Sequence, residues 1–456
     1  MNAPFVPHTE AEIAAMLADL GLASLEELFE TVPAAIRLAG GLDLPPHQSE
    51  ADVADRLAEL GERNRPAGRG TGGRSLVCFA GAGAYDHEVP AVVRSLAGRS
   101  EFVTAYTPYQ PEVAQGVLQA VFEYQTMVAR LSGLEIANGS LYDGAASLVE
   151  GVNLAVAATG RARVLCSAGV NPRWRQVLAT FAKGSGHEVE TVPLRGGATD
   201  WEGAASTREE AGAVVVAFPN YLGCLEDVTA ARKVADATGA RLVVAFDPVA
   251  SGLLRTPGSL GADVAVGEGQ PLGVSLGFGG PYLGLFACRA ADVRKLPGRL
   301  VGETVDAEGR PAYVTTLRAR EQDIRREKAS SNVCTNQTLM AVTAAIQLSW
   351  LGTAGLREVA LRCARAARYT FESLSAIDGV EPVTTAPYFR ELALRLPVEP
   401  EAAVERLAEE GFLAGVPVRE GFENSDAEGS LLVAATERRT RSEIDGFAAA
   451  LEKAVR

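Results

Sequence analysis

The residues best suited to chemistry lie between positions 241 and 286, where an acidic residue follows one apolar run and a glycine-rich loop follows the next. Asp247 ends the first run, and the second leads into GEGQPLG at 267–273. In α/β enzymes that use pyridoxal phosphate, an aspartate at a strand end pairs with the pyridinium nitrogen and a lysine forms the Schiff base. Asp247 fits the first role, but the loop where the lysine is expected contains none.

The five lysines of the chain are poor candidates for the missing group. Four fall on predicted exposed helices, in a charged stretch or close to the carboxyl end: Lys183, Lys233, Lys295 and Lys453. Lys328 stays open as an alternative, because Arg325 and Arg326 beside it would lower its pKa. A solvated run of charges explains the same pattern and is the favoured interpretation.

Nucleotide and metal sites are not favoured. Gly81 and Gly83 follow a predicted strand at 75–80, but no complete phosphate-loop motif is present, so we predict a tight turn. The six cysteines and four histidines are dispersed without ligand spacing. We therefore expect neither a metal site nor a disulfide framework.

An aromatic and proline-rich segment at 100–112 is the second candidate for function. Pro108 and Pro111 fix the backbone and remove donors, so a regular helix is not expected there. Rigid loops of this kind often line binding sites, although packing of Tyr106 and Tyr109 would explain the composition equally.

The small-residue loop at 138–147 precedes a predicted helix at 145–158. Free amide groups at a helix start can bind an anion such as a phosphate. Capping of the helix by Asp143 or Ser140 explains the same residues, and we favour capping.

The elements that must position these residues alternate between strands and helices. We predict helices near 113–134, 174–183 and 227–238, and strands at 163–167, 188–192, 213–218, 241–246, 264–267 and 284–288. Short apolar strands separated by helices indicate a mainly parallel sheet that is covered on both faces. The predicted fold class is α/β.

Three regions are expected. Residues 1–65 form a helical arm, where Thr9 with Glu12 and Ser24 with Glu27 have capping-box spacing. Residues 66–330 form the large α/β domain. Residues 331–456 form a smaller α+β domain, with helices to about 351 and at 356–376, strands at 389–396 and 431–435, and a last helix capped by Thr440 with Glu443.

Charge and hydropathy limit the partners. Acidic residues outnumber basic ones by 57 to 43 and the net charge is −14, so no overall positive field is available to hold nucleic acid or an anionic membrane. The start of the chain lacks signal-peptide features, and no apolar stretch approaches the roughly 20 residues that span a bilayer. We expect a cytoplasmic protein with no membrane contact.

Six irregular strings along nearly the whole chain carry a resemblance to a known family. They are residues 79–87 (FAGAGAYDH), 107–112 (TPYQPE), 124–127 (YQTM), 138–146 (NGSLYDGAA), 267–273 (GEGQPLG) and 331–337 (SNVCTNQ). Together they resemble the alpha subunit (subunit 1) of split P-proteins, the glycine dehydrogenases (decarboxylating) of the glycine cleavage system.

The resemblance implies a fold-type I pyridoxal-phosphate transferase-like architecture, with an aspartate-aminotransferase-like large domain. It also implies a homologous beta subunit that carries the lysine and the cofactor, in an alpha2-beta2 heterotetramer. The family's lysine aligns within one residue of Gln270, and a glutamine cannot form an imine. This chain is therefore expected to bind no cofactor covalently.

By the same resemblance, the heteromer decarboxylates glycine and transfers the aminomethyl group to the lipoyl arm of the H protein. The residues expected to line the partner's active site come from the aromatic loop and the 331–337 string: Tyr106, Tyr109, Gln110, Asn332, Thr335 and Asn336. Asp247 is expected to have a structural role here. Two alternatives remain, namely a self-sufficient homodimeric enzyme that uses Lys328 and a non-catalytic regulatory subunit.

The isolated chain should form no covalent bond with pyridoxal phosphate, because residue 270 is a glutamine. Borohydride reduction in the presence of the cofactor, followed by peptide mass analysis, should leave every lysine without a specific pyridoxyl group. An adduct at one defined lysine would contradict the prediction.

Overall fold

The computed structural model describes residues 7–38, 42–68, 75–104, 107–205, 209–423 and 425–456, and it divides into two compact units, 1–64 and 65–456. The first unit contains α1 (Glu10–Asp19), the 3-10 turns η1 (Leu25–Phe29) and η2 (Ala34–Ile36), and α2 (Glu50–Gly61). Thr9 and Glu12 form the predicted capping box. The second predicted box is wrong, because Ser24 precedes a 3-10 turn and its side chain makes no capping hydrogen bond.

A seven-stranded sheet organises the second unit. Its order is β2-β10-β9-β8-β7-β3-β4, parallel from β9 to β4 and antiparallel at β10 and β2. The strands are β2 (Ile136–Ala137), β3 (Arg163–Ser167), β4 (Glu188–Val192), β7 (Ala213–Phe218), β8 (Arg241–Phe246), β9 (Val264–Glu268) and β10 (Gly284–Cys288). The mainly parallel sheet expected from the sequence is confirmed.

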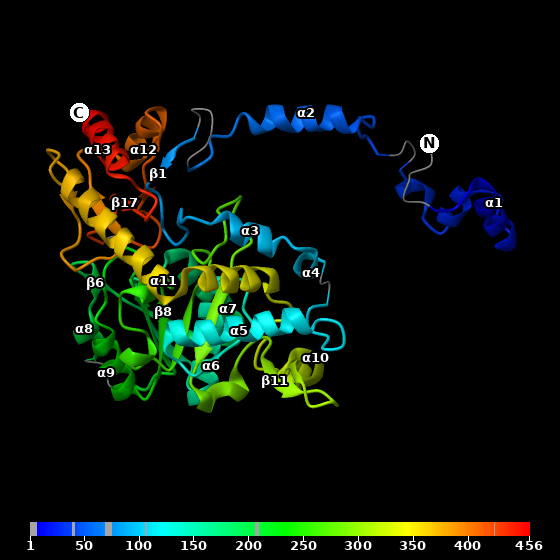
Figure 1. The fold of residues 1–456 in the computed structure, drawn as a ribbon, viewed down its shortest axis with the longest axis horizontal. Coiled ribbons are helices and arrows are strands. Elements are labelled where there is room, and N and C mark those ends of the chain that lie inside the picture. Colours follow the sequence, from blue (N-terminus) through cyan, green and yellow to red (C-terminus); the bar gives the residue numbers. More distant parts are fainter. Residues whose placement is uncertain (1–6, 39–41, 69–74, 105–106, 206–208, 424) are drawn as a thin grey trace. The chain divides into compact units, whose positions relative to one another are not determined.

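Alternate residues of the central strands face opposite helical layers, as strand geometry requires. Val214 and Val216 pack with residues of α5 (Gln115–Ser132), α9 (Val228–Thr238) and α11 (Thr338–Leu374). Ala213 and Val215 pack with α6 (Gly144–Thr159) and α7 (Pro172–Ser185). Both faces are covered, and Figure 1 shows α5 and α11 running alongside each other.

A second, antiparallel sheet lies in the carboxyl-terminal part of the chain, in the order β13-β14-β17-β16. Its strands are β13 (Glu381–Pro382), β14 (Glu391–Arg395), β16 (Val416–Pro417) and β17 (Leu431–Ala434). α12 (Pro400–Glu409), α13 (Arg441–Val455) and the end of α11 enclose its core. β1 (Val77–Cys78) joins this region by pairing with β15 (Phe412–Leu413). The division at residue 330 stays a prediction.

Shorter elements connect these layers. Along the chain they are α3 (Ala91–Ala97), α4 (Ser100–Val103), β5 (Leu194–Arg195), β6 (Ala198–Thr199), α8 (Trp201–Ala205), η3 (Ala250–Gly252), η4 (Gly258–Leu260), η5 (Ala290–Lys295), β11 (Val301–Val305), β12 (Pro311–Thr315), η6 (Arg318–Arg320), α10 (Gln322–Arg325) and η7 (Arg326–Lys328). α4 corrects the expectation that the segment 100–112 contains no helix, because its one turn ends before Pro108.

α11 merges the two helices that were predicted separately. Gly352 lies between them with a φ of 59°, a left-handed conformation that glycine adopts without steric cost, and it kinks the helix. By length and composition α11 could cross a membrane, contrary to the expectation that no segment reaches this length. It packs against α3, α5 and α13, as a core helix does.

Candidate functional site

The carboxyl end of β8 places Asp247 beside an arginine from the other sheet. Arg390, directly before β14, donates from Nη2 to Asp247 Oδ2. The backbone amides of Val249 and Ala250 donate to Asp247 Oδ1 at 2.8 and 3.0 Å. The Arg390 side chain is only 3% exposed, and Asp247 and Tyr85 raise its pKa even though burial lowers it. The cation that Asp247 faces therefore belongs to the chain itself.

Gln270, at the position expected for the lysine, is buried and bonded to the backbone of the 79–87 loop. Its Oε1 accepts from the Tyr85 amide at 2.9 Å, and its Nε2 donates to the carbonyl oxygens of Tyr85 at 3.1 Å and Val274 at 2.8 Å. Both amide protons and the oxygen are used. The side chain is thus a structural link between the loop after β9 and the 79–87 loop.

The amino terminus of α6 is occupied by carboxylates of the chain. Asp143 accepts from the Ala146 amide at 2.7 Å, so the predicted capping is confirmed. Glu268 accepts from the amides of Gly144, Gln270 and Leu283 at 2.8–3.0 Å. Burial raises the pKa of Glu268 to about 7. Amide groups at this helix start, where a phosphate could bind, therefore donate to carboxylates of the chain itself.

The 79–87 loop forms the predicted tight turn against Glu391. The Ala82 amide and the Tyr85 hydroxyl donate to Glu391 at 2.6 and 2.5 Å. A Cβ on Gly81 would lie 2.4 Å from the Glu391 carboxylate, so only glycine permits this approach. The Arg390 guanidinium lies 3.4 Å from the centre of the Tyr85 ring, a close cation–π contact.

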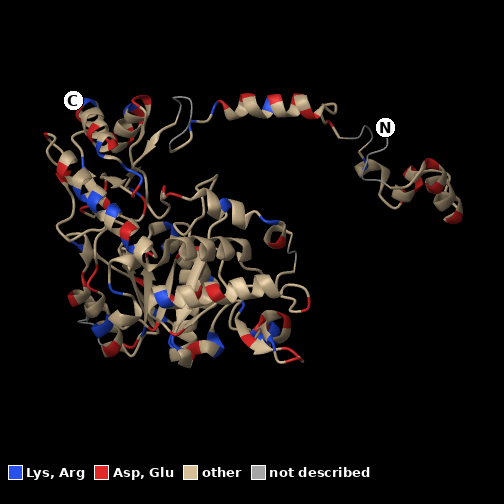
Figure 2. Ribbon diagram, viewed as in Figure 1, with Lys and Arg blue, Asp and Glu red and all other residues tan. Residues whose placement is uncertain are grey.

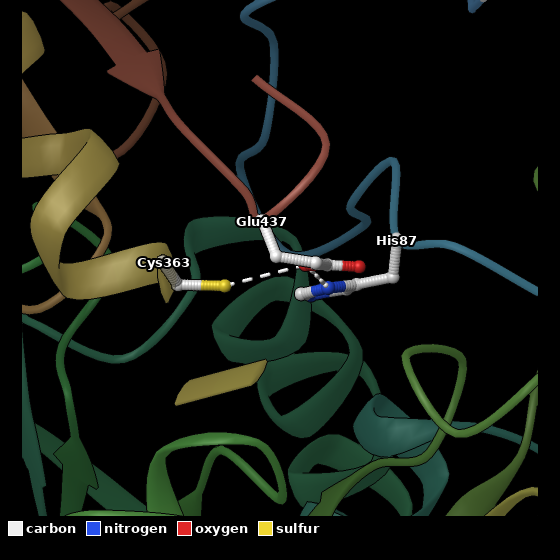
Figure 3. Close-up of side chains that lie close together, drawn as sticks. All are labelled: His87, Cys363 and Glu437. Atoms are coloured by element: carbon white, nitrogen blue, oxygen red, sulfur yellow. Dashed lines mark hydrogen bonds and ion pairs between the residues drawn. The ribbon is translucent and has the colours of Figure 1, made fainter. Parts of the chain in front are cut away.

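The same arginine reaches a buried polar cluster of His87, Cys363 and Glu437, drawn in Figure 3. Arg390 Nη1 lies 2.6 Å from His87 Nε2, so that nitrogen accepts, and His87 Nδ1 donates to Glu437 at 2.6 Å. The Cys363 thiol donates to the same carboxylate at 3.4 Å. Burial raises the pKa of Glu437, but His87 and the Glu88 amide outweigh it and lower the pKa to about 2.

These three side chains have ligand-forming atoms within 4.8 Å of one another, which their spacing in the sequence did not indicate. A metal ion would have to displace the proton on His87 Nδ1 and lie next to the Arg390 guanidinium. Each of the three side chains already has a hydrogen-bond partner within the chain. The expectation that the chain has no metal site stays a prediction.

The cavity around Asp247 and Arg390 has a volume of about 80 Å³, room for a few water molecules. Its walls include Tyr85, Trp174, Tyr221 and Glu268, and none of the five lysines, all of which are described, lines it. Lys328 is exposed in η7. The residues present therefore do not fit a covalently bound pyridoxal phosphate.

A second cluster forms where the aromatic loop meets the start of α11. The Tyr109 hydroxyl donates to Asn336 Oδ1 and lies 3.3 Å from the Thr338 hydroxyl. Asn336 Nδ2 donates to the Gly139 carbonyl at 2.9 Å. Arg299, which the sequence did not single out, stacks on the Tyr109 ring at 5.0 Å and pairs with buried Glu321.

Not all of the predicted site residues meet there. Gln110, Asn332 and Thr335 are exposed, and Tyr106 lies outside the described residues. Among the described members of the predicted set, the hydrogen bond between two side chains is that of Tyr109 with Asn336. Arg299 lies between η5 and β11, and no motif in the sequence marked it as a partner of Tyr109.

Comparison with solved structures defines the class of protein. The fold is similar to that of a glutamate decarboxylase from Lactobacillus brevis, with a TM-score of 0.67 at 13% identity over 93% of this chain and 96% of that one. It is similar to a cysteine desulfurase from Escherichia coli, with a TM-score of 0.61 at 16% identity over 83% and 94%. The chain has the α/β fold of fold-type I pyridoxal-phosphate enzymes.

Sequence comparison then gives the family. Residues 3–451 match the glycine cleavage system P-protein family. The chain is 46% identical to the probable glycine dehydrogenase (decarboxylating) subunit 1 of Moorella thermoacetica over 98% of both chains. It is 47% identical, with a TM-score of 0.90 over the whole of both chains, to a crystal structure of glycine decarboxylase (P-protein) of the glycine cleavage system in inhibitor-bound form. The chain belongs to the glycine cleavage system P-protein family, which confirms the resemblance.

Replacing Asp247 by Asn should destabilise the protein by about 3–5 kcal/mol, because it leaves Arg390 buried without a counter-charge. Chemical denaturation measures this loss. The double variant Asp247→Asn, Arg390→Met removes both charges and should recover part of the stability. Turnover per folded complex should change little, and a collapse of activity at an unchanged melting temperature would contradict a structural role.

Glu391 should make stability depend on pH, because burial raises its pKa from 4.5 to about 7. Between these values the folded chain binds more protons than the unfolded chain, so this group's contribution lowers stability as pH rises. Glu391→Gln removes the titration, and its unfolding free energy relative to wild type should increase by about 3 kcal/mol from pH 4.5 to 7.5. Denaturation at both pH values tests this. Glu405→Gln, at an exposed site on α12, is the control, and an equal change there would contradict the assignment.

Proposed function

We propose that this chain is the alpha subunit of a heteromeric glycine dehydrogenase (decarboxylating) and works with a homologous beta subunit that carries the lysine and pyridoxal phosphate. The observation that carries the proposal is family membership over the full length, combined with a glutamine at position 270. The name "subunit 1" of the relatives supports a partner subunit. An alpha2-beta2 assembly in the cytoplasm is part of the proposal.

The heteromer decarboxylates glycine and transfers the aminomethyl group to the lipoyl arm of the H protein. Pyridoxal phosphate, held by the partner, supplies the electron sink for this chemistry. The contribution of this chain is to orient groups at the partner's site and to exclude water from it. Its own cavity, of about 80 Å³, has room for only a few water molecules.

The Tyr109–Asn336 cluster supports a role in the partner's site. Two irregular loops meet there, and Arg299 with Glu321 holds the tyrosine ring from one side. The Tyr109 hydroxyl donates within the chain, which leaves its oxygen free to accept from substrate or from the lipoyl arm. The exposed groups of Gln110, Asn332 and Thr335 complete the proposed surface.

The two alternatives have less support. A self-sufficient enzyme would need Lys328 close to Asp247, yet this lysine is exposed and does not line the cavity. A purely regulatory subunit would leave the Tyr109–Asn336 cluster without a catalytic consequence. The second alternative is separated from the proposal by the following variant.

Tyr109→Phe should lower the turnover of glycine decarboxylation roughly 10²-fold, the scale of one positioned polar group, with assembly unchanged. Exchange of labelled carbon dioxide into glycine measures turnover, and gel filtration measures assembly. Tyr106→Phe tests the neighbouring tyrosine in the same way. Tyr313→Phe, whose ring packs on Phe122, is the matched control. Wild-type exchange in both loop variants would leave packing as the role of the loop.

A further inference from the structure

A basic pocket lies between α11 and α13, away from the cavity at Asp247. Its volume is about 440 Å³, which falls within the usual range for small-molecule sites. The residues that line it are Arg362, Arg365, Ala366, Tyr369, Glu437, Arg439, Arg441 and Ile444. We call this set the α11–α13 pocket.

Helical spacing explains why the arginines converge. Arg362, Arg365 and Tyr369 follow one another at intervals of three and four residues, so they share one face of α11. Figure 2 shows basic residues gathered on this carboxyl-terminal half of α11. Arg439 and Arg441 flank Thr440, the N-cap of α13, whose helix start adds a positive end to the same wall.

Arg439 provides an independent sign of a missing partner. Its side chain is 1% exposed, and Nη2 pairs with Asp86 at 3.0 Å. Its Nε and Nη1 atoms are buried and have no hydrogen-bond partner in the described part of the chain. Unsatisfied buried donors are costly, and an acceptor brought by a ligand would remove that cost.

The lining contains four arginines and one glutamate, and carboxylates beside the pocket pair with some of these arginines. Arg365 is exposed and has no carboxylate partner among the described residues, whereas Arg362 pairs with Glu358 at 2.8 Å. Arg441 lies over the Tyr369 ring and donates to its hydroxyl at 3.1 Å, and that hydroxyl donates to Asp445 at 2.5 Å. The one carboxylate of the lining, Glu437, is already engaged by His87. Arginines thus outnumber carboxylates in the lining by four to one, in a chain whose net charge is −14.

We infer that the α11–α13 pocket binds a phosphate-bearing small molecule. Guanidinium groups bind phosphate oxygens through paired, charge-assisted hydrogen bonds, and several arginines around one cavity match an anion with more than one negative charge. The lining shares no residue with the cavity at Asp247 or with the Tyr109–Asn336 cluster. The site is thus separate from the proposed decarboxylation site.

Titration calorimetry of the full chain at fixed ionic strength tests the inference, with inorganic pyrophosphate and ADP as separate probes. Saturable binding with one site per chain is expected. Arg365→Gln and Arg441→Gln should each weaken the binding at least tenfold. Stronger binding of ADP than of pyrophosphate would identify a nucleotide site, and equal binding would identify recognition of the phosphate groups alone.

Arg368→Gln is the matched control, because Arg368 is exposed on the same helix, pairs with Glu372 and does not line the pocket. It should bind both probes as wild type does. The inference is overturned if neither probe binds the wild-type chain, or if Arg368→Gln weakens binding as much as Arg365→Gln. Unchanged melting temperatures of the variants would show that any loss is not due to unfolding.

Discussion

The ion pair between Asp247 and Arg390 is the contact on which the interior of this protein depends. Asp247 directly follows a central strand of the large sheet, whereas Arg390 directly precedes a strand of the small one. The same guanidinium stacks on Tyr85 and reaches His87. One buried cation thus joins both sheets to the 79–87 loop. A charge this deeply buried is tolerated only when its partners surround it, so these segments must assemble together.

Glu268 and Gln270 are polar side chains that also have hydrogen-bond partners within the chain. A fold-type I site offers a carboxylate for a cationic ring, a helix start for a phosphate and a lysine for the covalent bond. Here Arg390 faces the carboxylate, Glu268 lies at the amino terminus of α6, and Gln270 binds the Tyr85 backbone. Arg390 thus neutralises the Asp247 carboxylate, Glu268 accepts from an amide at the helix start, and Gln270 accepts from the Tyr85 amide. These three side chains are thus bonded to partners within the chain.

α11 connects this interior to two outer features. Its start lies beside the Tyr109–Asn336 cluster, and its carboxyl-terminal half carries Arg362 and Arg365 of the α11–α13 pocket and buried Cys363. The kink at Gly352 separates these two halves. The helix therefore packs against the large sheet with one half and encloses the small sheet with the other. Its apolar composition reflects burial between these layers.

The sequence by itself determined the elements and the missing lysine. Six strands of the large sheet and the caps at Thr9, Asp143 and Thr440 were predictable, because short apolar runs and capping residues act over a few positions. Only the tertiary structure decided which side chains meet: Asp247 and Arg390 are 143 positions apart, and His87 and Glu437 are 350 apart. It also decided that Arg299 supports Tyr109. No local pattern encodes such pairs, because their energies depend on burial and geometry that exist only after the sheets have packed together.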